Sequence, residues 1–466
     1  MFSPHLALIL HPSLLALVSS ILFIVFAIAV LRLHAFLALM LAATLVGILG
    51  PGAGFSLAQI VELVMTEFGT ATGRIGFSIA IAAVIGAALM ASGAADKIVR
   101  RFVAVLGEKR APLALLVSSY ILAIPVFFDT VFFLLVPLAR ALSLRTRGNY
   151  ALHLLAICGG VITHATVPPT PGPLAAAETM QIDLGFAILV GIVAGILPAL
   201  GGLAFARWRD RRMPVPLRAT GGSSLESVAA MAGKDEAELP GFMVSIAPVV
   251  LPLLLIAGAS LAATLRGALP PGGIAAIEFL GNKNVALFIG AAIAVAVCLR
   301  QKSLGWRDTE NIVGEPLMTA GVIILITAAG GAYGTMLRNA GIGDVVRGLA
   351  GSESPNFILL SWTLAAILRI AQGSVTVSMI TTAGIVMSLV GADGFGVHPV
   401  YVFLAIGYGA TSLSWMNDSG FWVFSRMSGL TDQETLRSWT PLLTLISLLG
   451  LVQILVVAYF FPGVGR

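Results

Sequence analysis

Long apolar runs recur along this chain from Leu14 to Tyr459, separated by shorter polar or basic segments. A helix needs about 20 residues to cross a membrane, and runs of that length recur here. Backbone groups in lipid must satisfy their own hydrogen bonds, so solid runs predict helices, whereas a barrel would show short alternating segments. The run from Leu14 to Leu31 has no Lys or Arg before it, so we interpret it as a retained helix rather than a cleaved signal peptide. The pattern predicts an all-α polytopic membrane protein.

Basic residues gather in short loops beside the apolar runs, and they set the expected topology. Lys and Arg stay on the cytoplasmic side of a membrane. Basic clusters follow the run 76–93, precede residue 150, and open the polar, acidic stretch 207–240. We therefore expect 207–240 to be a cytoplasmic linker between two halves, and the N-terminus to lie outside.

Two segments of the first half are unusual membrane spans. Residues 111–142 are too long for one span and too short for two, and basic residues lie at both ends. We expect a re-entrant hairpin there, with its tip at Pro125. In the span 150–180, the four prolines within 168–173 cannot continue a helix. This second span is therefore expected to be a broken helix.

The second half repeats this plan at a constant offset of 248 residues, with no gap needed. The offset aligns Gly172 with Gly420 and places a second hairpin at 357–390 and a second broken helix at 399–427. Crossings counted from the linker make this half run in the opposite direction, and inverted repeats with broken helices are the architecture of secondary transporters. The expected parts are N-terminal helices 1–75, repeat 76–206, linker 207–240, connecting helices 241–315 and repeat 316–466, which ends with a helix at 439–461.

Composition agrees with a lipid environment and narrows the chemistry. Of the 466 residues, 58% are hydrophobic and 11% are charged, against about 25% charged in ordinary soluble domains. The net charge of +5 does not indicate nucleic-acid binding, because the basic residues sit beside apolar runs. Cys158 and Cys298 lie in apolar sequence without a CxxC spacing or a His cluster, so we expect neither a disulfide nor a metal site. No GxxxxGK[ST] motif is present, and we expect no cofactor.

At the four breaks, the residues resemble the gluconate permease family of gluconate:proton symporters, within the ion transporter superfamily. The resemblance is carried by Ile124-Pro-Val-Phe-Phe-Asp129, His164 through Pro173, Ala371-Gln-Gly-Ser-Val-Thr376 and Asn417-Asp-Ser-Gly-Phe-Trp422. It implies proton-coupled uptake of gluconate or a related sugar acid in a bacterial inner membrane. The chain departs from the family pattern at Trp415, where the family usually has a His, and at 328–334, where the family has a longer glycine run. Both departures lie close to the presumed binding segments.

Several other functions are compatible with the same residues. The coupling ion can be sodium instead of a proton, since unwound carbonyls also hold Na⁺. The substrate can be a hydroxy-amino acid or a dicarboxylate, which relatives in the superfamily suggest. A membrane-embedded enzyme would use Asp129, His164 and Asp418 as acid and base groups, and an ion channel is a further alternative. We expect a homodimer as the assembly, and we expect no enzyme activity.

Polar residues at the second hairpin tip and at both breaks are the candidates for substrate binding. Arg369 precedes the second tip, and a buried guanidinium can hold a carboxylate through two parallel hydrogen bonds. It can equally pair with a carboxylate of the protein such as Asp418 or Asp129, or reach the interface. The small and hydroxyl residues nearby either contact the substrate or permit tight helix packing and capping. The candidate substrate-binding residues are Arg369, Gln372, Gly373, Ser374, Thr376, Asn417, Asp418, Ser419, Thr166 and Thr170.

Three titratable residues are candidates for proton coupling. Asp129 follows the first tip, and intramembrane carboxylates are costly and usually functional. The alternative is that Asp129 caps the second arm of the hairpin. His164 opens the first break and can exchange protons near neutral pH, although a His that bonds an unwound carbonyl fits equally well. Asp418, in the second break, is the third candidate.

Overall fold

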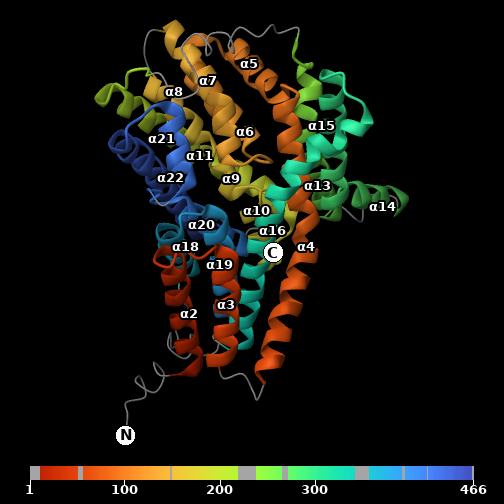
Figure 1. Cartoon of the computed structure of the whole chain (residues 1–466), viewed down its shortest axis with the longest axis vertical. Coiled ribbons are helices and arrows are strands. Elements are labelled where there is room, and N and C mark those ends of the chain that lie inside the picture. The colour runs from red at the N-terminus through yellow and green to blue at the C-terminus, as the bar shows by residue number, and fades with distance from the viewer. Residues whose placement is uncertain are drawn as a thin grey trace.

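The computed structural model describes residues 11–50, 56–146, 150–218, 238–264, 271–341, 356–390, 394–416 and 418–463. Figure 1 shows these residues as helices joined by connecting segments, and no described residue forms a strand. Seven helical segments among them are long and apolar enough to cross a membrane. The expected all-α class is therefore confirmed for the described part of the chain.

The N-terminal region forms helices α2 (Pro12–Ala29), α3 (Ala35–Leu49) and α4 (Leu57–Ala91). Helix α4 has 35 residues, begins at a capping box made by Ser56 and Gln59, and runs alongside α16 (Thr309–Asn339). Both helices are continuous, although Pro316 lies inside α16. The part boundaries expected after residues 75 and 315 therefore lie inside α4 and α16.

In the rest of the first half, the membrane segments are interrupted where the prolines and the tip sequence indicate. Residues 123–127 separate α6 from α7, and residues 167–170 separate α9 from α10. The arginines at 207–212 belong to the end of α11, so only the residues after them leave the helix. The helices are α5 (Ala94–Leu106), α6 (Ala111–Leu122), α7 (Phe128–Thr146), α8 (Tyr150–Gly160), α9 (Thr163–Thr166), α10 (Pro171–Thr179) and α11 (Leu184–Arg212).

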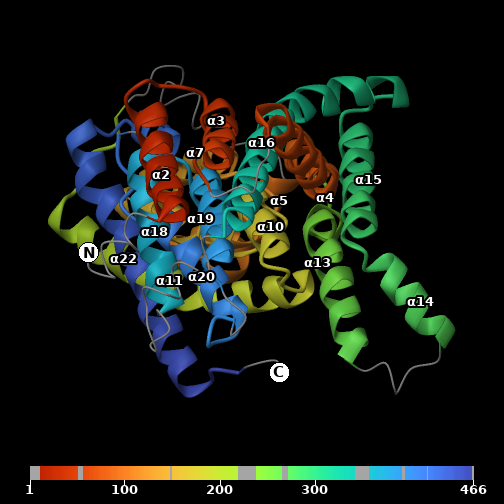
Figure 2. The ribbon, with the colours of Figure 1, turned by 90° about the horizontal axis from the view of Figure 1, so that it is seen from below.

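The second half contains corresponding interruptions at 373–374 and 412–416. Before them, α13 (Phe242–Thr264), α14 (Pro271–Leu280) and α15 (Lys283–Gln301) form an arm that projects from the remaining helices in Figure 2. The apolar pattern did not predict α14, whose 10 residues are too few to span a membrane. The later helices are α18 (Phe357–Gln372), α19 (Val375–Leu389), α20 (Pro399–Thr411), α21 (Ser419–Ser428) and α22 (Asp432–Phe460).

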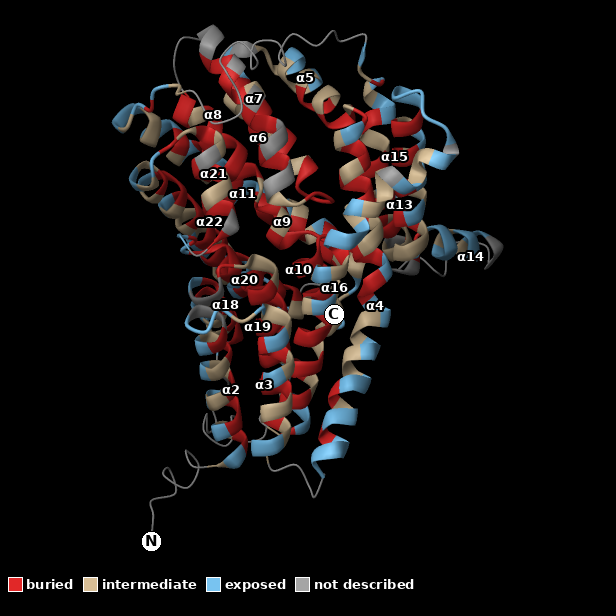
Figure 3. Cartoon of the chain, viewed as in Figure 1, coloured by how far each residue is buried: buried red, intermediate tan, exposed pale blue. Residues whose placement is uncertain are grey.

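The interior lies where the interrupted segments meet. Figure 1 shows the pair α6 and α7 in the upper part and the pair α18 and α19 in the lower part, with α9, α10 and α20 between them. Figure 3 shows buried residues concentrated in this middle region, and exposed positions along the outer faces of α2, α3 and α4. Large apolar side chains such as Leu22, Leu41 and Val61 are exposed there. Such outward apolar faces fit lipid rather than water.

Candidate functional site

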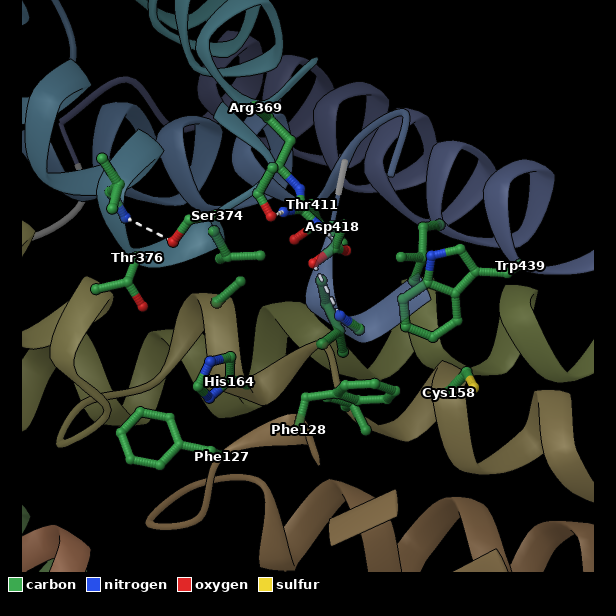
Figure 4. A pocket seen from close by; sticks show the side chains of 18 of the residues that line it. Phe127, Phe128, Cys158, His164, Arg369, Ser374, Thr376, Thr411, Asp418 and Trp439 are labelled. Atoms are coloured by element: carbon green, nitrogen blue, oxygen red, sulfur yellow. Dashed lines mark hydrogen bonds and ion pairs between the residues drawn. The ribbon is translucent and has the colours of Figure 1, made fainter. Parts of the chain in front are cut away.

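A cavity of about 380 Å³ lies where the two helix-pair tips meet the two interrupted segments. Phe127 and Phe128 line it from the α6–α7 tip, and His164 lines it from α9. The α18–α19 tip contributes the run 373–377, and Asp418 comes from the connection before α21. Helices α16 and α22 close its sides. Figure 4 shows Arg369 and Ser374 entering from one side, opposite His164 and the two phenylalanines. Residues far apart in sequence thus line one cavity.

A buried ion pair dominates the second-half side of the cavity. Arg369, in the last turn of α18, is only 2% exposed, and its Nη2 donates to Asp418 Oδ2. Its Nη1 donates to the carbonyl of Gly373. The other carboxylate oxygen of Asp418 accepts from the Gly420 N–H at 3.0 Å, and Ser414 Oγ donates to Oδ2. Arg369 therefore pairs with a carboxylate of the protein, Asp418, which is one of the alternatives that the sequence left open.

The turn at the α18–α19 tip explains how Arg369 reaches this position. Gly373 ends α18 with φ of 74°, a left-handed conformation that favours glycine. Ser374 then caps α19 by accepting from the Val377 N–H at 3.3 Å. The tip therefore turns within two residues, and its Gly373 carbonyl faces the guanidinium.

An aromatic cluster supports the ion pair from behind. Trp439 Nε1 donates to Ser414 Oγ at 2.7 Å, so the indole holds the hydroxyl that donates to Asp418. The Trp439 ring lies 4.9 Å from Phe128 and 5.2 Å from Phe424, measured between ring centroids. The sequence interpretation missed Ser414 and Trp439. Ser414 lies within the second break and was visible there, whereas nothing near Trp439 in sequence marked it.

The described residues on the first-half side of the cavity include no Asp, Glu, Lys or Arg. His164 packs edge-on against Phe127 with ring centroids 5.8 Å apart, and its Nδ1 is buried without a hydrogen-bond partner among the described residues. Thr170 Oγ1 donates to the His164 carbonyl at 3.0 Å, and Thr166 Oγ1 donates to the Ile162 carbonyl at 3.2 Å. Both threonines are buried, and neither is among the residues that line the cavity. They satisfy freed backbone carbonyls of the break.

Some candidates lie outside the described residues. These are Asn417 and the side chains of Asp129, Gln372 and Ser419. Of the remaining candidates, the cavity brings together Arg369, Gly373, Ser374, Thr376, Asp418 and His164.

The two departures from the expected family pattern do not line the cavity. Trp415 is 43% exposed, and its Nε1 donates to the Ile370 carbonyl at 3.1 Å at the end of α18. The segment 328–334 packs α16 on α19, where a Cβ on Gly334 would lie 2.6 Å from the Gly384 Cα. Both segments therefore act on helix packing near the cavity rather than on its surface.

A second cavity, of about 660 Å³, borders the first one at Phe127 and Thr319, which line both. Its other walls come from α4, from Pro125 and Val126, and from the loop around Lys302 and Leu304. Arg300, Lys302 and Arg307 lie in or beside that loop, and basic loops beside apolar runs are typical of the cytoplasmic side. Phe127 and Thr319 are thus the boundary between a central and a peripheral space.

The described residues contain no group of three or more His, Cys, Asp or Glu that could hold a metal ion. A family model described as GntP family permease matches residues 12–460, nearly the whole chain. The chain belongs to the GntP permease family. The resemblance found at the four breaks is therefore confirmed, and the family consists of permeases rather than enzymes.

Relatives of this GntP permease have similar length. A gluconate permease of Pseudomonas aeruginosa is 32% identical, covering 92% of this chain and 93% of that protein. The Gnt-II system L-idonate transporter of Escherichia coli is also 32% identical, covering 91% and 94%. An uncharacterized permease of Haemophilus influenzae is 30% identical, covering 97% and 93%. With its apolar helices, the permease is an integral inner-membrane protein.

A solved structure shares the fold. The YdaH transporter of Alcanivorax borkumensis, described as having an unusual topology, superposes with a TM-score of 0.61 over 97% of this chain and 99% of that chain. The identity is 14%, so this likeness bears on the fold alone.

Proposed function

We propose that this permease takes up gluconate or a related sugar acid together with protons. The observation that carries the proposal is the cavity surface, which combines a buried guanidinium with the hydroxyls of Ser374, Thr376 and Thr411. Arg369 suits a carboxylate, and the hydroxyls suit a polyhydroxy chain. A volume of about 380 Å³ falls in the range of small-molecule sites. Relatives named for gluconate and L-idonate handle acids of this class.

In this proposal the substrate lies between the two tips, with its acid group toward Arg369. Helices α19 and α21 begin at the cavity, and helix N-termini carry partial positive charge that attracts an anion. Substrate hydroxyls then face Ser374 and Thr376, with Gln372, Asn417 and Ser419 as further candidates. Thr166 and Thr170 contribute indirectly, through the shape of the first break. Asp129, Asp418 and His164 are the proton-carrying candidates.

Two contacts support the inverted repeat that alternating access needs. A Cβ on Gly172 would lie 3.4 Å from the Thr376 Cα, so the first break touches the second tip. A Cβ on Gly420 would lie 3.3 Å from the Phe128 ring, so the second break touches the first tip. The offset of 248 residues pairs Gly172 with Gly420 and Phe128 with Thr376, so the two contacts are equivalent under the repeat. This exchange is what two halves related by an internal two-fold axis produce.

The second cavity provides a route toward the cytoplasmic loops in the same proposal. Phe127 and Thr319 separate it from the substrate cavity, so their movement would open the inner side. The α6–α7 tip, which carries Phe127, is the element that we expect to move.

Uptake of labelled gluconate into proteoliposomes tests the proposal. We expect saturable uptake that an inside-alkaline pH gradient stimulates and that a protonophore abolishes, with protein-free liposomes as the blank. A sodium gradient of equal size should have no effect, and stimulation by it would favour the sodium-coupled alternative. If the uptake rate of every sugar acid tried is independent of the pH gradient, the proton-symport proposal is wrong.

A thermal-shift screen of sugar acids, dicarboxylates and hydroxy-amino acids identifies the substrate class, since a bound ligand stabilises the folded protein.

A further inference from the structure

The ion pair between Arg369 and Asp418 leaves donor capacity on the guanidinium. Only one carboxylate oxygen of Asp418 meets Arg369, because the other accepts from the Gly420 N–H. Arg369 Nε is buried and has no hydrogen-bond partner among the described residues. A guanidinium commonly holds a carboxylate through two parallel bonds, so this pairing is incomplete. Arg369 can therefore form a fuller set of bonds with a different carboxylate.

Charge balance limits how such a carboxylate can enter. Among the described lining residues, Arg369 is the only Lys or Arg, Asp418 is the only Asp or Glu, and His164 is the only His. The charges of Arg369 and Asp418 balance each other before a substrate enters, and an anionic substrate adds one uncompensated negative charge. Charges away from water are costly unless they are paired, and two carboxylates that share one cation do not both remain ionised.

We propose that the substrate carboxylate replaces Asp418 as the partner of Arg369, and that Asp418 takes up a proton in the same step. This inference rests on the proposed function of the cavity, and it selects Asp418 from the three proton-carrying candidates. The proton adds to a carboxylate oxygen of Asp418, and no other covalent bond forms or breaks. The charge of the site stays at zero: a cation with ionised Asp418 before loading, and the same cation with the substrate anion and neutral Asp418 afterwards.

This exchange couples the binding of the substrate to the binding of the proton at one site. A proton without a substrate leaves Arg369 as an unpaired buried cation, and a substrate without a proton leaves an excess buried anion. Both states are disfavoured by the same burial, so the fully empty and fully loaded forms predominate. The exchange also favours monocarboxylates, because no second Lys or Arg is among the described lining residues to balance a dicarboxylate.

Calorimetric titration of gluconate into the detergent-purified protein between pH 6 and pH 8 tests the exchange. In the unaltered protein, we expect Kd to rise about tenfold for each pH unit, since one proton binds with each substrate. Asp418→Asn, which imitates the protonated side chain, should bind gluconate with a Kd that does not change with pH. Asp210→Asn is the matched control, because Asp210 accepts from the Leu152 N–H at the far end of α11. That control should keep the full pH dependence.

The outcomes separate this inference from the proposed function. If the unaltered protein binds no sugar acid, the proposed function fails. If it binds gluconate with a pH-dependent Kd and Asp418→Asn keeps that dependence, the exchange is wrong while the proposed function stands. A thermal-shift measurement shows whether Asp418→Asn is folded. If it is not, Ser414→Ala removes one donor to Asp418 Oδ2, and we expect severalfold tighter binding at pH 8; an unchanged Kd would overturn the exchange.

Discussion

The two interrupted segments of this permease form hydrogen bonds at their breaks with different kinds of side chain. The offset of 248 residues places Asp418 on Thr170 and Ser414 on Thr166. Thr170 donates to two backbone carbonyls, those of His164 and Val167, at 3.0 and 2.8 Å. Asp418 instead accepts from Arg369, Ser414 and the Gly420 N–H. The first break is therefore closed by neutral hydroxyls, and the second is closed by charges.

This difference suggests to us which half responds to a charged solute in the proposed function. A hydroxyl that is satisfied by backbone carbonyls keeps its partners whatever enters the cavity. A buried ion pair changes when another anion or a proton arrives, because each charge depends on the other. We therefore propose that the first half determines the shape of the cavity and that the second half recognises charge. The following variants test that division, from the largest expected effect to the smallest.

Arg369→Met should have the largest effect. It leaves Asp418 buried without its cation, which typically costs about 3–5 kcal/mol, and it removes the group that we propose binds the substrate carboxylate. We expect at least a ~100-fold loss of gluconate uptake in proteoliposomes and a lower unfolding midpoint in detergent. The double variant with Asp418→Leu should regain stability but not uptake, because an apolar pair can replace a buried ion pair. A single variant as stable as the double would contradict this account of the pair.

His164→Phe should have an intermediate effect. Phenylalanine keeps the edge contact with Phe127 but removes Nδ1, which has no hydrogen-bond partner among the described residues and borders the cavity. The loss of one hydrogen bond to a substrate hydroxyl, about 1 kcal/mol, predicts a roughly fivefold higher KM. The dependence of Kd on pH should remain. If it disappears, His164 and not Asp418 is the residue that binds the proton.

Thr170→Val should have a smaller effect on uptake than on stability. Valine keeps the shape of threonine but leaves the two carbonyls without their hydroxyl, at a cost of about 1–2 kcal/mol. We expect a lower unfolding midpoint, uptake reduced by no more than about threefold, and unchanged dependence on pH. A change in that dependence would show that the first break also takes part in charge recognition.

Arg218→Ala provides the comparison with an exposed ion pair. Arg218 donates to both carboxylate oxygens of Glu434, at 2.6 and 2.9 Å, and the two side chains are 37% and 21% exposed. Exposed pairs contribute about 0–1 kcal/mol, because water already solvates the charges. Uptake should stay within about twofold of that of the unaltered protein, measured in the same proteoliposomes. A loss as large as that of Arg369→Met would show that burial is not what distinguishes the pair.

The breaks were predictable because their causes are local. The four prolines within 168–173 cannot together continue a helix, Gly373 ends α18 in a left-handed conformation, and the offset carried the first half onto the second. The part boundaries expected after residues 75 and 315 do not coincide with helix ends, since α4 and α16 continue through them. Helix α14 escaped notice because it is shorter than a membrane span.

The candidate site was predictable only as a set of residues. Arg369 and Asp418 were both expected at the cavity, but whether they pair depends on how two segments 49 residues apart meet. Ser414 and Trp439 were missed for the same reason, because their role lies in a chain of contacts that ends at Asp418. Thr166 and Thr170 appeared equivalent to the residues of the second tip, and only the fold shows that they face backbone carbonyls.

Proton uptake on substrate binding is the most direct test of charge recognition by the second half. Gluconate would be added to purified protein in weakly buffered detergent solution near pH 7.5, with a pH indicator reporting the protons taken up. We predict about one proton for each gluconate bound in the unaltered protein and none in Asp418→Asn. Binding of gluconate to the unaltered protein without any proton uptake would contradict the account.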